Sequence, residues 1–339
     1  MTFRMSRRQV LASMGAAAAA NTLAAPAVHA ATTVKVGALR FTSHAASFVA
    51  FERGYFAEQG LDVEFEFFQA AQPMAVAIAS GDVDFGVTAI TGGLINLADR
   101  GAAKVIGGAL SEEAGIDGQM ILASAAAHAD GLTSPAGLDG RSFGVTQPGS
   151  SFHYMGSQIA AAEGASLSFT PLQRVPAIIG ALRSGQIDAW TIVPHIGKAI
   201  SAGEDVVHIG WVADYLPDYQ VTTVFTSAET AANERAKAEA FLAAFSAGGA
   251  DFNAALVDKT AGEEADEAMV RLIHQYVYTD REYERAAPSI RNGAMRLNAD
   301  AALNTSSVAR QLAWFQSEGL IDADITLETL VDDSYVATS

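Results

Sequence analysis

The sequence predicts a two-lobed α/β protein in which each lobe is a mainly parallel sheet flanked by helices, with two hinge strands between the lobes. Three observations support this fold class. Strand-like and helix-like patterns alternate along the chain, as in parallel sheets. A helix–glycine–strand pattern occurs twice, once in each half of the chain. The length of 339 residues also exceeds the roughly 100–200 residues of a single domain.

The first 30 residues have the pattern of a secretory signal peptide. Arg7 and Arg8 precede an uncharged, alanine-rich run at residues 10–25, and small residues at 28–30 offer a cleavage site before Ala31. Paired arginines are typical of the twin-arginine export signal; the alternative is an ordinary signal that holds two adjacent arginines. The run is shorter than the ~20 residues of a membrane span, so we expect an exported, soluble chain.

Composition excludes several classes of function. The chain has no cysteine, which rules out disulfides, thiolate metal sites, a cysteine nucleophile and a lipid-modified N-terminal cysteine. The formal net charge is −17, and removal of residues 1–30 takes away three arginines and no acid. Such acidity disfavours nucleic acid and anionic membranes as partners. It does not exclude an anionic ligand, because local dipoles in a pocket can oppose the net charge.

The first lobe begins directly after the predicted signal. An alternating strand pattern at residues 34–39 is followed by a polar turn at 40–44 and a helical run at 45–52. Gly60 suits the end of the next short helix, and a second strand follows at 62–67. The order strand, helix, strand predicts a parallel sheet.

An internal repeat is the most informative structural feature. In each copy an alanine-rich helix ends at a glycine, Gly81 or Gly185, which tolerates the left-handed conformation of a helix end. An apolar residue and an aspartate, Asp84 or Asp188, then lead into a buried strand. Two copies predict two similarly built lobes, whereas a solenoid would need more copies at a shorter period.

The remaining strand-like runs predict where the chain changes lobe. We interpret β-prone runs at residues 119–123 and 220–226 as paired hinge strands. The first part of lobe 1 is then residues 31–123, lobe 2 is residues 124–218, and residues 219–339 return to lobe 1 and form C-terminal helices. These helices have apolar stripes and are expected to pack on the outside of lobe 1.

Several segments, in order along nearly the whole chain after residue 31, resemble one family. They are residues 54–56 and 59–63, 80–85, 144–151, 181–189, and 314–315 with 319–320. The chain is similar to the nitrate, sulfonate and taurine-type periplasmic binding proteins of ABC importers, whose wider family includes binders of thiamine pyrimidine precursors. The resemblance implies a monomeric periplasmic protein that closes two lobes on a small-molecule ligand, delivers it to a membrane permease, and has neither cofactor nor catalytic activity.

The alternative is an exported enzyme of the same fold that acts on a small heterocycle or an organic acid. Enzymes similar to thiamine pyrimidine synthases belong to the wider family, and they carry a cysteine-rich segment with their active chemistry. The absence of cysteine argues against that activity here. The sequence also has no recognisable nucleophile turn and no phosphate-binding loop.

Ligands of α/β sheets sit beyond the carboxyl ends of strands, and four strand ends carry suitable residues. The candidate ligand-binding residues are Arg40, Phe41, Thr42, Ser43 and His44; Thr88, Thr91 and Gly92; Gln147, Gly149, Ser150, Ser151, Phe152 and His153; and His195. Helix starts at the first and third sites offer free N–H groups to an anion. One serine suffices to cap the second of these helices, so the other is left for binding.

Plainer interpretations exist for the same residues. The first site is also compatible with a surface turn and a capping serine, and a single histidine is more often structural than a ligand contact. The three candidate histidines, His44, His153 and His195, are far apart in the sequence, and this spacing does not predict a metal site. Helix starts and hydroxyls predict a small organic anion, a sulfonate or carboxylate, and the aromatic rings of Phe41 and Phe152 allow an aromatic body.

Overall fold

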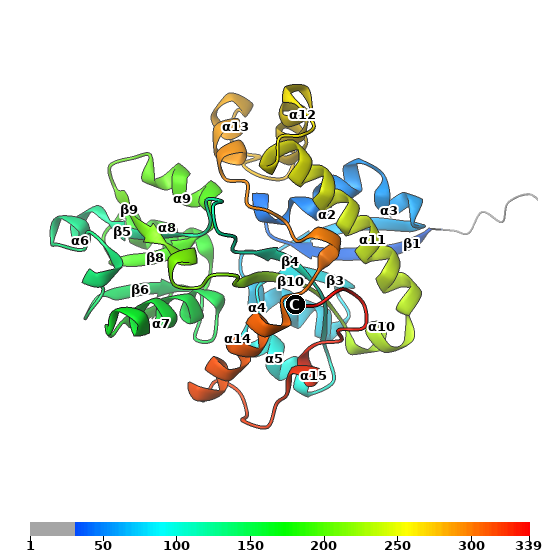
Figure 1. The fold of residues 1–339 in the computed structure, drawn as a ribbon, viewed down its shortest axis with the longest axis horizontal. Helices are drawn as coiled ribbons and strands as arrows, with labels where there is room; N and C mark the ends of the chain where they lie inside the picture. Colours follow the sequence, from blue (N-terminus) through cyan, green and yellow to red (C-terminus); the bar gives the residue numbers. More distant parts are fainter. Residues whose placement is uncertain (1–30) are drawn as a thin grey trace, which may run out of the picture. The chain divides into compact units, whose positions relative to one another are not determined.

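The computed structural model describes residues 31–339, and the predicted signal peptide at residues 1–30 lies outside the described residues. The described chain forms two five-stranded sheets, one in each lobe (Figure 1). The first has the order β2-β1-β3-β10-β4, with strands Thr32–Ala38 (β1), Leu61–Phe67 (β2), Phe85–Thr88 (β3), Lys104–Ser111 (β4) and Gln220–Thr226 (β10). The second has the order β7-β6-β8-β5-β9, with strands Met120–Ser124 (β5), Ser142–Val145 (β6), Ser168–Pro171 (β7), Ala189–Ile192 (β8) and Val206–Trp211 (β9).

The predicted fold class is confirmed, and each sheet is mixed in direction. β1 pairs in parallel with β2 and β3, while β10 runs antiparallel to β3 and β4. The second sheet repeats this scheme, with β6 parallel to β7 and β8, and β5 antiparallel to β8 and β9. Each lobe therefore has a parallel half built from strand–helix–strand units and an antiparallel half built from strands next to the lobe crossings.

The internal repeat corresponds to equivalent parts of the two lobes. Gly81 and Gly185 both follow a helix and have positive φ angles of 78° and 72°. Asp84 Oδ2 accepts a hydrogen bond from the Lys35 amide at 2.8 Å. Asp188 Oδ2 accepts one from the Ser142 amide, also at 2.8 Å. Each aspartate thus ties the start of the central strand to the neighbouring parallel strand, which explains why the pattern recurs.

The predicted pairing of the two hinge strands is wrong. The run at 119–123 largely forms β5, which belongs to the second sheet, and the run at 220–226 forms β10 of the first sheet. Both strands are buried along their length, so the apolar pattern identified them correctly without specifying a partner. The chain changes lobe between β4 and β5 and again between β9 and β10.

The two crossing segments, residues 112–119 and 212–219, are joined to each other by backbone hydrogen bonds. The Glu112 amide donates to the Tyr219 carbonyl oxygen and the Val212 amide donates to the Gln119 carbonyl oxygen, both at 2.9 Å. The first crossing thus precedes the predicted boundary after residue 123. These segments are the hinge region of the molecule.

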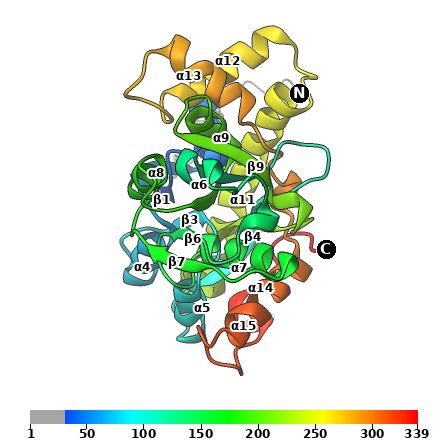
Figure 2. The ribbon, with the colours of Figure 1, turned by 90° about the vertical axis from the view of Figure 1, so that its left-hand side faces the viewer.

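Helices cover both sheets. Those of the first lobe are Ala45–Glu52 (α2), Tyr55–Glu58 (α3), Ala71–Ser80 (α4), Gly92–Asp99 (α5), Ala228–Asn233 (α10), Arg235–Phe252 (α11), Thr305–Ser317 (α14) and Leu327–Leu330 (α15). Those of the second lobe are Ala125–Ala129 (α6), Ser151–Glu163 (α7), Val175–Arg183 (α8) and Pro194–Ser201 (α9). Two more, Glu263–His274 (α12) and Tyr283–Asn292 (α13), follow α11, and α13 packs against α9 (Figures 1 and 2).

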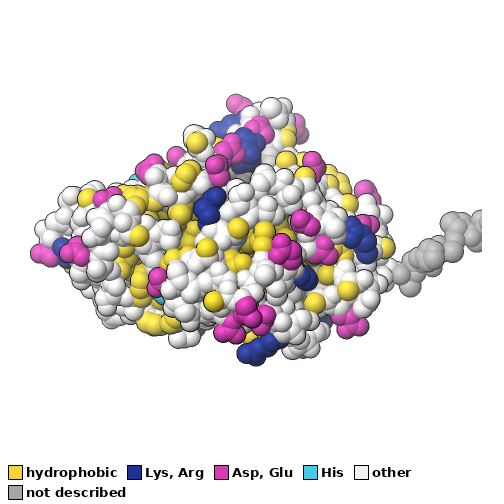
Figure 3. All heavy atoms as spheres, turned by 60° about the horizontal axis from the view of Figure 1, so that its bottom comes forward, with side chains coloured by type: hydrophobic (Ala, Val, Ile, Leu, Met, Phe, Trp, Pro, Cys, Tyr) yellow, Lys and Arg dark blue, Asp and Glu magenta, His cyan; other side chains and the backbone are white. Residues whose placement is uncertain are grey.

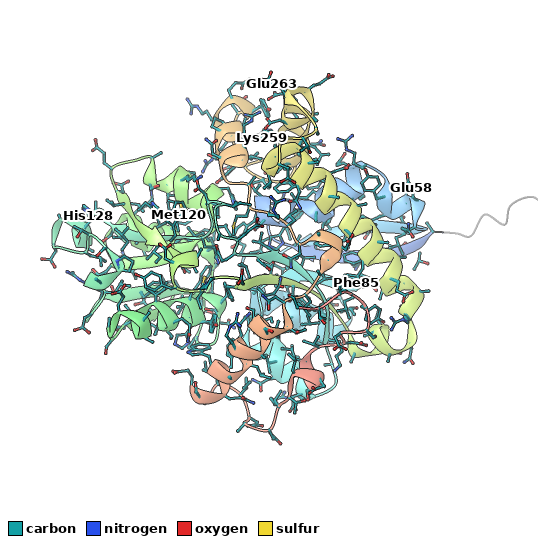
Figure 4. All side chains as sticks on the ribbon, viewed as in Figure 1. Glu58, Phe85, Met120, His128, Lys259 and Glu263 are labelled. Atoms are coloured by element: carbon teal, nitrogen blue, oxygen red, sulfur yellow. The ribbon has the colours of Figure 1, made fainter. Side chains whose placement is uncertain are left out.

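The longest helix belongs to the core of the first lobe. The helical run Arg235–Val257 is long and apolar enough to cross a membrane. However, 56% of its most apolar 18-residue stretch is buried inside the protein. On the first sheet the ring of Phe85, marked in Figure 4, stacks on Phe241 of α11 with ring centroids 4.1 Å apart. This burial identifies α11 as a core helix.

Candidate functional site

A partly enclosed cavity of about 50 Å³, which we call the inner cavity, lies between the two lobes beside the hinge. Its wall contains apolar side chains and eight polar ones, Ser43, His44, Thr88, Gln119, Thr146, Ser150, Ser151 and Thr222. None of the wall residues is Asp, Glu, Lys or Arg. The cavity wall is therefore mixed, with ten apolar and eight polar residues, and it carries no fixed side-chain charge.

Residues from the first lobe enter the cavity where β1 and β3 end. The 3-10 turn Thr42–His44 follows β1 and buries Ser43 and His44, and Thr88 is the last residue of β3. Thr222 of β10 completes this side. The hydroxyls of Ser43 and Thr222 are buried and have no hydrogen-bond partner within residues 31–339. An unpartnered buried hydroxyl costs about 1–3 kcal/mol, so such groups at a cavity wall are suited to bind a polar ligand.

His44 is a neutral hydrogen-bonding group of the cavity wall. Its Nδ1 accepts a hydrogen bond from the Leu39 amide at 3.3 Å, so the ring proton lies on Nε2 and is available for donation. Burial lowers the pKa of His44 to about 3. The ring thus stays uncharged at neutral pH and can donate one hydrogen bond.

The second lobe contributes the start of α7. Ser150 caps this helix, because its Oγ accepts a hydrogen bond from the His153 amide at 3.4 Å. Ser151 is the first helical residue, has no capping role and lines the cavity. A helix N-terminus carries partial positive charge and free N–H groups. This end of the cavity is thus suited to negative charge.

Of the predicted residues, the structure brings together seven at the inner cavity: Phe41, Ser43, His44, Thr88, Ser150, Ser151 and Phe152. Phe41 is half-buried, and its ring lies 5.8 Å from that of His44. Phe152 packs against Trp190 of β8 with ring centroids 5.4 Å apart. These aromatic rings give the cavity its apolar side.

Two predicted residues at the start of α5, Thr91 and Gly92, have other contacts. Thr91 caps the helix by accepting from the Leu94 amide at 3.1 Å, and its hydroxyl donates to Gln72 Oε1 at 2.8 Å. The Gly92 amide donates to the Gly149 carbonyl oxygen of the second lobe at 2.9 Å. Both glycines are therefore contacts between lobes and lie outside the inner-cavity wall.

Other predicted residues also lie outside this wall. Arg40 is exposed and stacks on Phe67, and Thr42 is buried in the turn after β1. Gln147 supplies a backbone oxygen to the turn before α7. His153 packs between Phe169 and Trp314, at ring distances of 4.2 and 5.1 Å. Burial is the main cause of its lowered pKa.

His195 lies behind Phe41 instead of in the cavity wall. Its ring is 5.2 Å from the Phe41 ring, and neither ring nitrogen has a partner within residues 31–339. Burial, with a smaller effect of His44, lowers its pKa to about 3. Across the described chain no group of three or more His, Cys, Asp or Glu side chains is arranged to hold a metal ion.

Three polar wall residues were not among the candidates. Thr146 directly follows β6, so the strand-end rule could have identified it. Thr222 lies inside a β-prone run and Gln119 lies in a lobe crossing. Their place at the cavity depends on how the hinge is folded, which the local pattern does not encode.

The lobes meet on more than one side of the cavity. Besides the bond between Gly92 and Gly149, the Val175 amide donates to the Gln69 carbonyl oxygen at 3.3 Å. The Tyr278 hydroxyl donates to the His195 carbonyl oxygen at 2.8 Å. The lobes are thus in contact around the cavity, in a closed arrangement.

Comparisons with known proteins agree with this architecture. The family described as NMT1/THI5 like matches residues 41–255, and no curated protein matches the chain. Among solved structures, the alkanesulfonate-binding protein SsuA from Xanthomonas axonopodis pv. citri, bound to MOPS, has a TM-score of 0.70 at 15% identity, covering 89% of this chain and 99% of that one. The periplasmic nitrate-binding protein NrtA from Synechocystis PCC 6803 has a TM-score of 0.67 at 15% identity, covering 88% and 84%.

A third structure, the periplasmic aliphatic sulphonate binding protein SsuA from Escherichia coli, has a TM-score of 0.66 at 17% identity, with 89% of this chain and 92% of that chain covered. At such identities the likeness concerns the fold. All three are periplasmic binding proteins, in agreement with the two-lobed α/β architecture observed here.

Proposed function

Because the chain belongs to the NMT1/THI5-like family, we propose that it is the periplasmic solute-binding subunit of an ABC importer. Its ligand is a small organic anion, a carboxylate or sulfonate, captured between the lobes by hinge closure. The observation that carries the proposal is the inner cavity, in which unpartnered hydroxyls and the N-terminus of α7 converge between closed lobes.

The cavity suits an anion although its wall contains no cationic side chain. The start of α7 supplies partial positive charge, and Ser43, Ser151 and Thr222 supply hydroxyl donors. The absence of wall carboxylates removes the strongest source of repulsion. Closure excludes water, which strengthens these hydrogen bonds.

Binding without catalysis fits the same residues. General acid–base chemistry needs a group whose pKa lies near the working pH. The wall holds no Asp, Glu or Lys, and His44 has a pKa of about 3. The alternative of an exported enzyme would need proton transfer by groups that this cavity does not contain.

Export and partners complete the proposal. The signal pattern of residues 1–30 would place the mature chain in the periplasm, by the twin-arginine or the general route. The solved relatives in fold named above are periplasmic binding proteins. A membrane permease would receive the ligand from the closed form, and the binding protein itself would act as a monomer.

A ligand screen tests the proposal. Thermal shift with a panel of carboxylates, sulfonates and pyrimidines should identify anions that raise the melting temperature. Small-angle scattering should then show a more compact chain with the bound anion than without it. Failure of every anion to stabilise the protein, or chemical conversion of a bound anion, would contradict the proposal.

A further inference from the structure

A second and larger cavity of about 520 Å³, which we call the outer cavity, adjoins the inner one. Leu39, Phe41 and Val175 line both cavities. The outer cavity is also bounded by α8 and α9 of the second lobe and by the segment between α12 and α13. Both cavities therefore belong to one cleft, with the half-buried Phe41 at their border.

The charged residues of the outer cavity wall have the opposite sign to the net charge of the chain. Its only charged wall residues are Arg40, Arg183 and Arg281. The whole chain has 38 Asp and Glu against 21 Lys and Arg, and acidic side chains are scattered over the face seen in Figure 3. Three arginines without a wall carboxylate thus form a local cationic site on an acidic protein.

The guanidinium groups remain largely available. Arg40 lies over the Phe67 ring at 3.7 Å and donates one hydrogen bond, from Nη1 to the Tyr276 carbonyl oxygen. Arg281 lies over the Tyr278 ring at 4.2 Å and has no ion pair within residues 31–339. Arg183 Nε forms an ion pair with Asp205 Oδ2 at 3.7 Å, which offsets part of its charge, but the distance is too long for a hydrogen bond. Each arginine keeps N–H donors for a carboxylate.

The two cavities differ in size and in what they can hold. A cavity needs roughly 10–15 Å³ of this kind of volume to hold one water molecule, so the inner cavity of about 50 Å³ accommodates one compact acidic group and little more. The outer cavity offers about ten times that volume, with Phe41, Phe68 and Ile179 as apolar wall beside the arginines.

We infer that the ligand is an elongated dianion, with two acidic groups separated by an aromatic or aliphatic body. This inference rests on the proposed function and extends it. One acidic group enters the inner cavity, the body lies along the apolar wall past Phe41, and the second acidic group binds Arg40, Arg183 and Arg281. A monoacid of the same length would leave Arg40 and Arg281 without an anionic partner.

Calorimetric titration with matched pairs of a monoacid and a diacid tests the inference. The pairs are heptanoate against pimelate and benzoate against terephthalate. Acetate represents the acidic group of the inner cavity without the rest of the ligand. In the unchanged protein each diacid should bind at least tenfold more tightly than its monoacid. The triple variant Arg40→Gln, Arg183→Gln and Arg281→Gln should lose this preference. Arg100→Gln, a single exposed charge change outside the outer cavity, should keep it.

Ile179→Glu provides a second test that leaves all three arginines in place. A carboxylate in the wall should repel the second acidic group, so diacid affinity should fall while acetate affinity stays unchanged; circular dichroism checks the fold. Equal binding of mono- and diacids by the unchanged protein would overturn the inference and leave the proposed function intact. A diacid preference that survives the triple variant would also overturn it. Binding of no anion at all would contradict the proposed function itself.

Discussion

The backbone amide of Gly92 donates a hydrogen bond to the carbonyl oxygen of Gly149, with an N–O distance of 2.9 Å. Gly92 is the first residue of α5 in the first lobe, and Gly149 precedes α7 in the second. Both were predicted to contact the ligand. Instead they contact each other and join the strand-end loops of the two lobes. We therefore expect this hydrogen bond to affect ligand affinity by stabilising the closed arrangement.

The variant Gly92→Pro isolates this contact. Proline is favoured at the first position of a helix, and Thr91 before it is extended, with φ −133° and ψ 156°. The substitution removes the N–H and places ring atoms against the Gly149 oxygen. A hydrogen bond contributes about 1 kcal/mol net, so we expect ligand affinity to fall by roughly tenfold once the steric effect is added. Calorimetric titration measures this change.

Gly92→Ala is the matched control. It retains the N–H, and its Cβ would lie 3.6 Å from the Phe315 ring, an ordinary contact. We expect affinity close to that of the unchanged protein. Equal affinity of the proline variant and this control would show that the bond does not stabilise the closed form.

Ser150 and Ser151 should have separable effects. Ser150 caps α7, so Ser150→Ala should lower the free energy of unfolding by about 1 kcal/mol. Ser151 has no capping role and lines the inner cavity. Ser151→Ala should therefore leave stability nearly unchanged and weaken anion binding several-fold, since one hydrogen bond to a charged group is lost.

Urea unfolding and calorimetric titration on the two single variants distinguish these roles. The double variant should show both losses. Unchanged anion affinity in the double variant would exclude the hydroxyls of Ser150 and Ser151 from the binding site.

Much of the fold followed from local patterns. The repeat around Asp84 and Asp188 was predictable, because each aspartate binds a backbone amide within its own lobe and each glycine before it requires a positive φ. The pairing of β5 and β10 was not predictable from their apolar runs. An apolar run identifies a buried strand, but the strands that pair with it depend on segments far away in the sequence.

The site was predictable to the extent that strand ends form it. Ser43, Thr88 and Ser151 follow the strand-end rule and line the inner cavity. Gly92 and His195 also follow strand ends, but they contact the other lobe and lie outside the inner-cavity wall. Contacts between the lobes depend on the tertiary structure. The local sequence therefore does not distinguish residues that contact the ligand from residues that contact the other lobe.

Glu112 in the first lobe crossing should make stability depend on pH. Burial raises the pKa of its carboxyl to about 7, and Oε2 has no hydrogen-bond partner within residues 31–339. Between pH ~4.5 and ~7 the unfolded chain loses this proton while the folded chain keeps it, so rising pH favours unfolding. Relative to Glu112→Gln, the unchanged protein should lose about 3 kcal/mol of stability across this window.

Urea unfolding at a series of pH values measures the difference between the two proteins. Glu64→Gln, on an exposed position of β2, is the control measured over the same series. A flat difference for Glu112→Gln would mean that the folded carboxyl titrates at its ordinary pKa.

His195 should produce the opposite dependence. Burial lowers its pKa to about 3, so as the pH falls below ~6.5 the unfolded chain gains a proton that the folded chain does not, and acid favours unfolding. Between pH 6.5 and 5 the unchanged protein should lose about 2 kcal/mol relative to His195→Leu, at 1.36 kcal/mol per pH unit. Both proteins keep His44, so the comparison reports mainly on His195.

His128→Leu is the control, because His128 lies half-buried at the outer edge of the second lobe (Figure 4). Its difference from the unchanged protein over the same range gives the baseline for the comparison. An equal slope for His128→Leu and His195→Leu would show that burial behind Phe41 does not keep His195 neutral. A steeper loss that depends on His195 would show that burial behind Phe41 keeps its imidazole neutral in the folded protein.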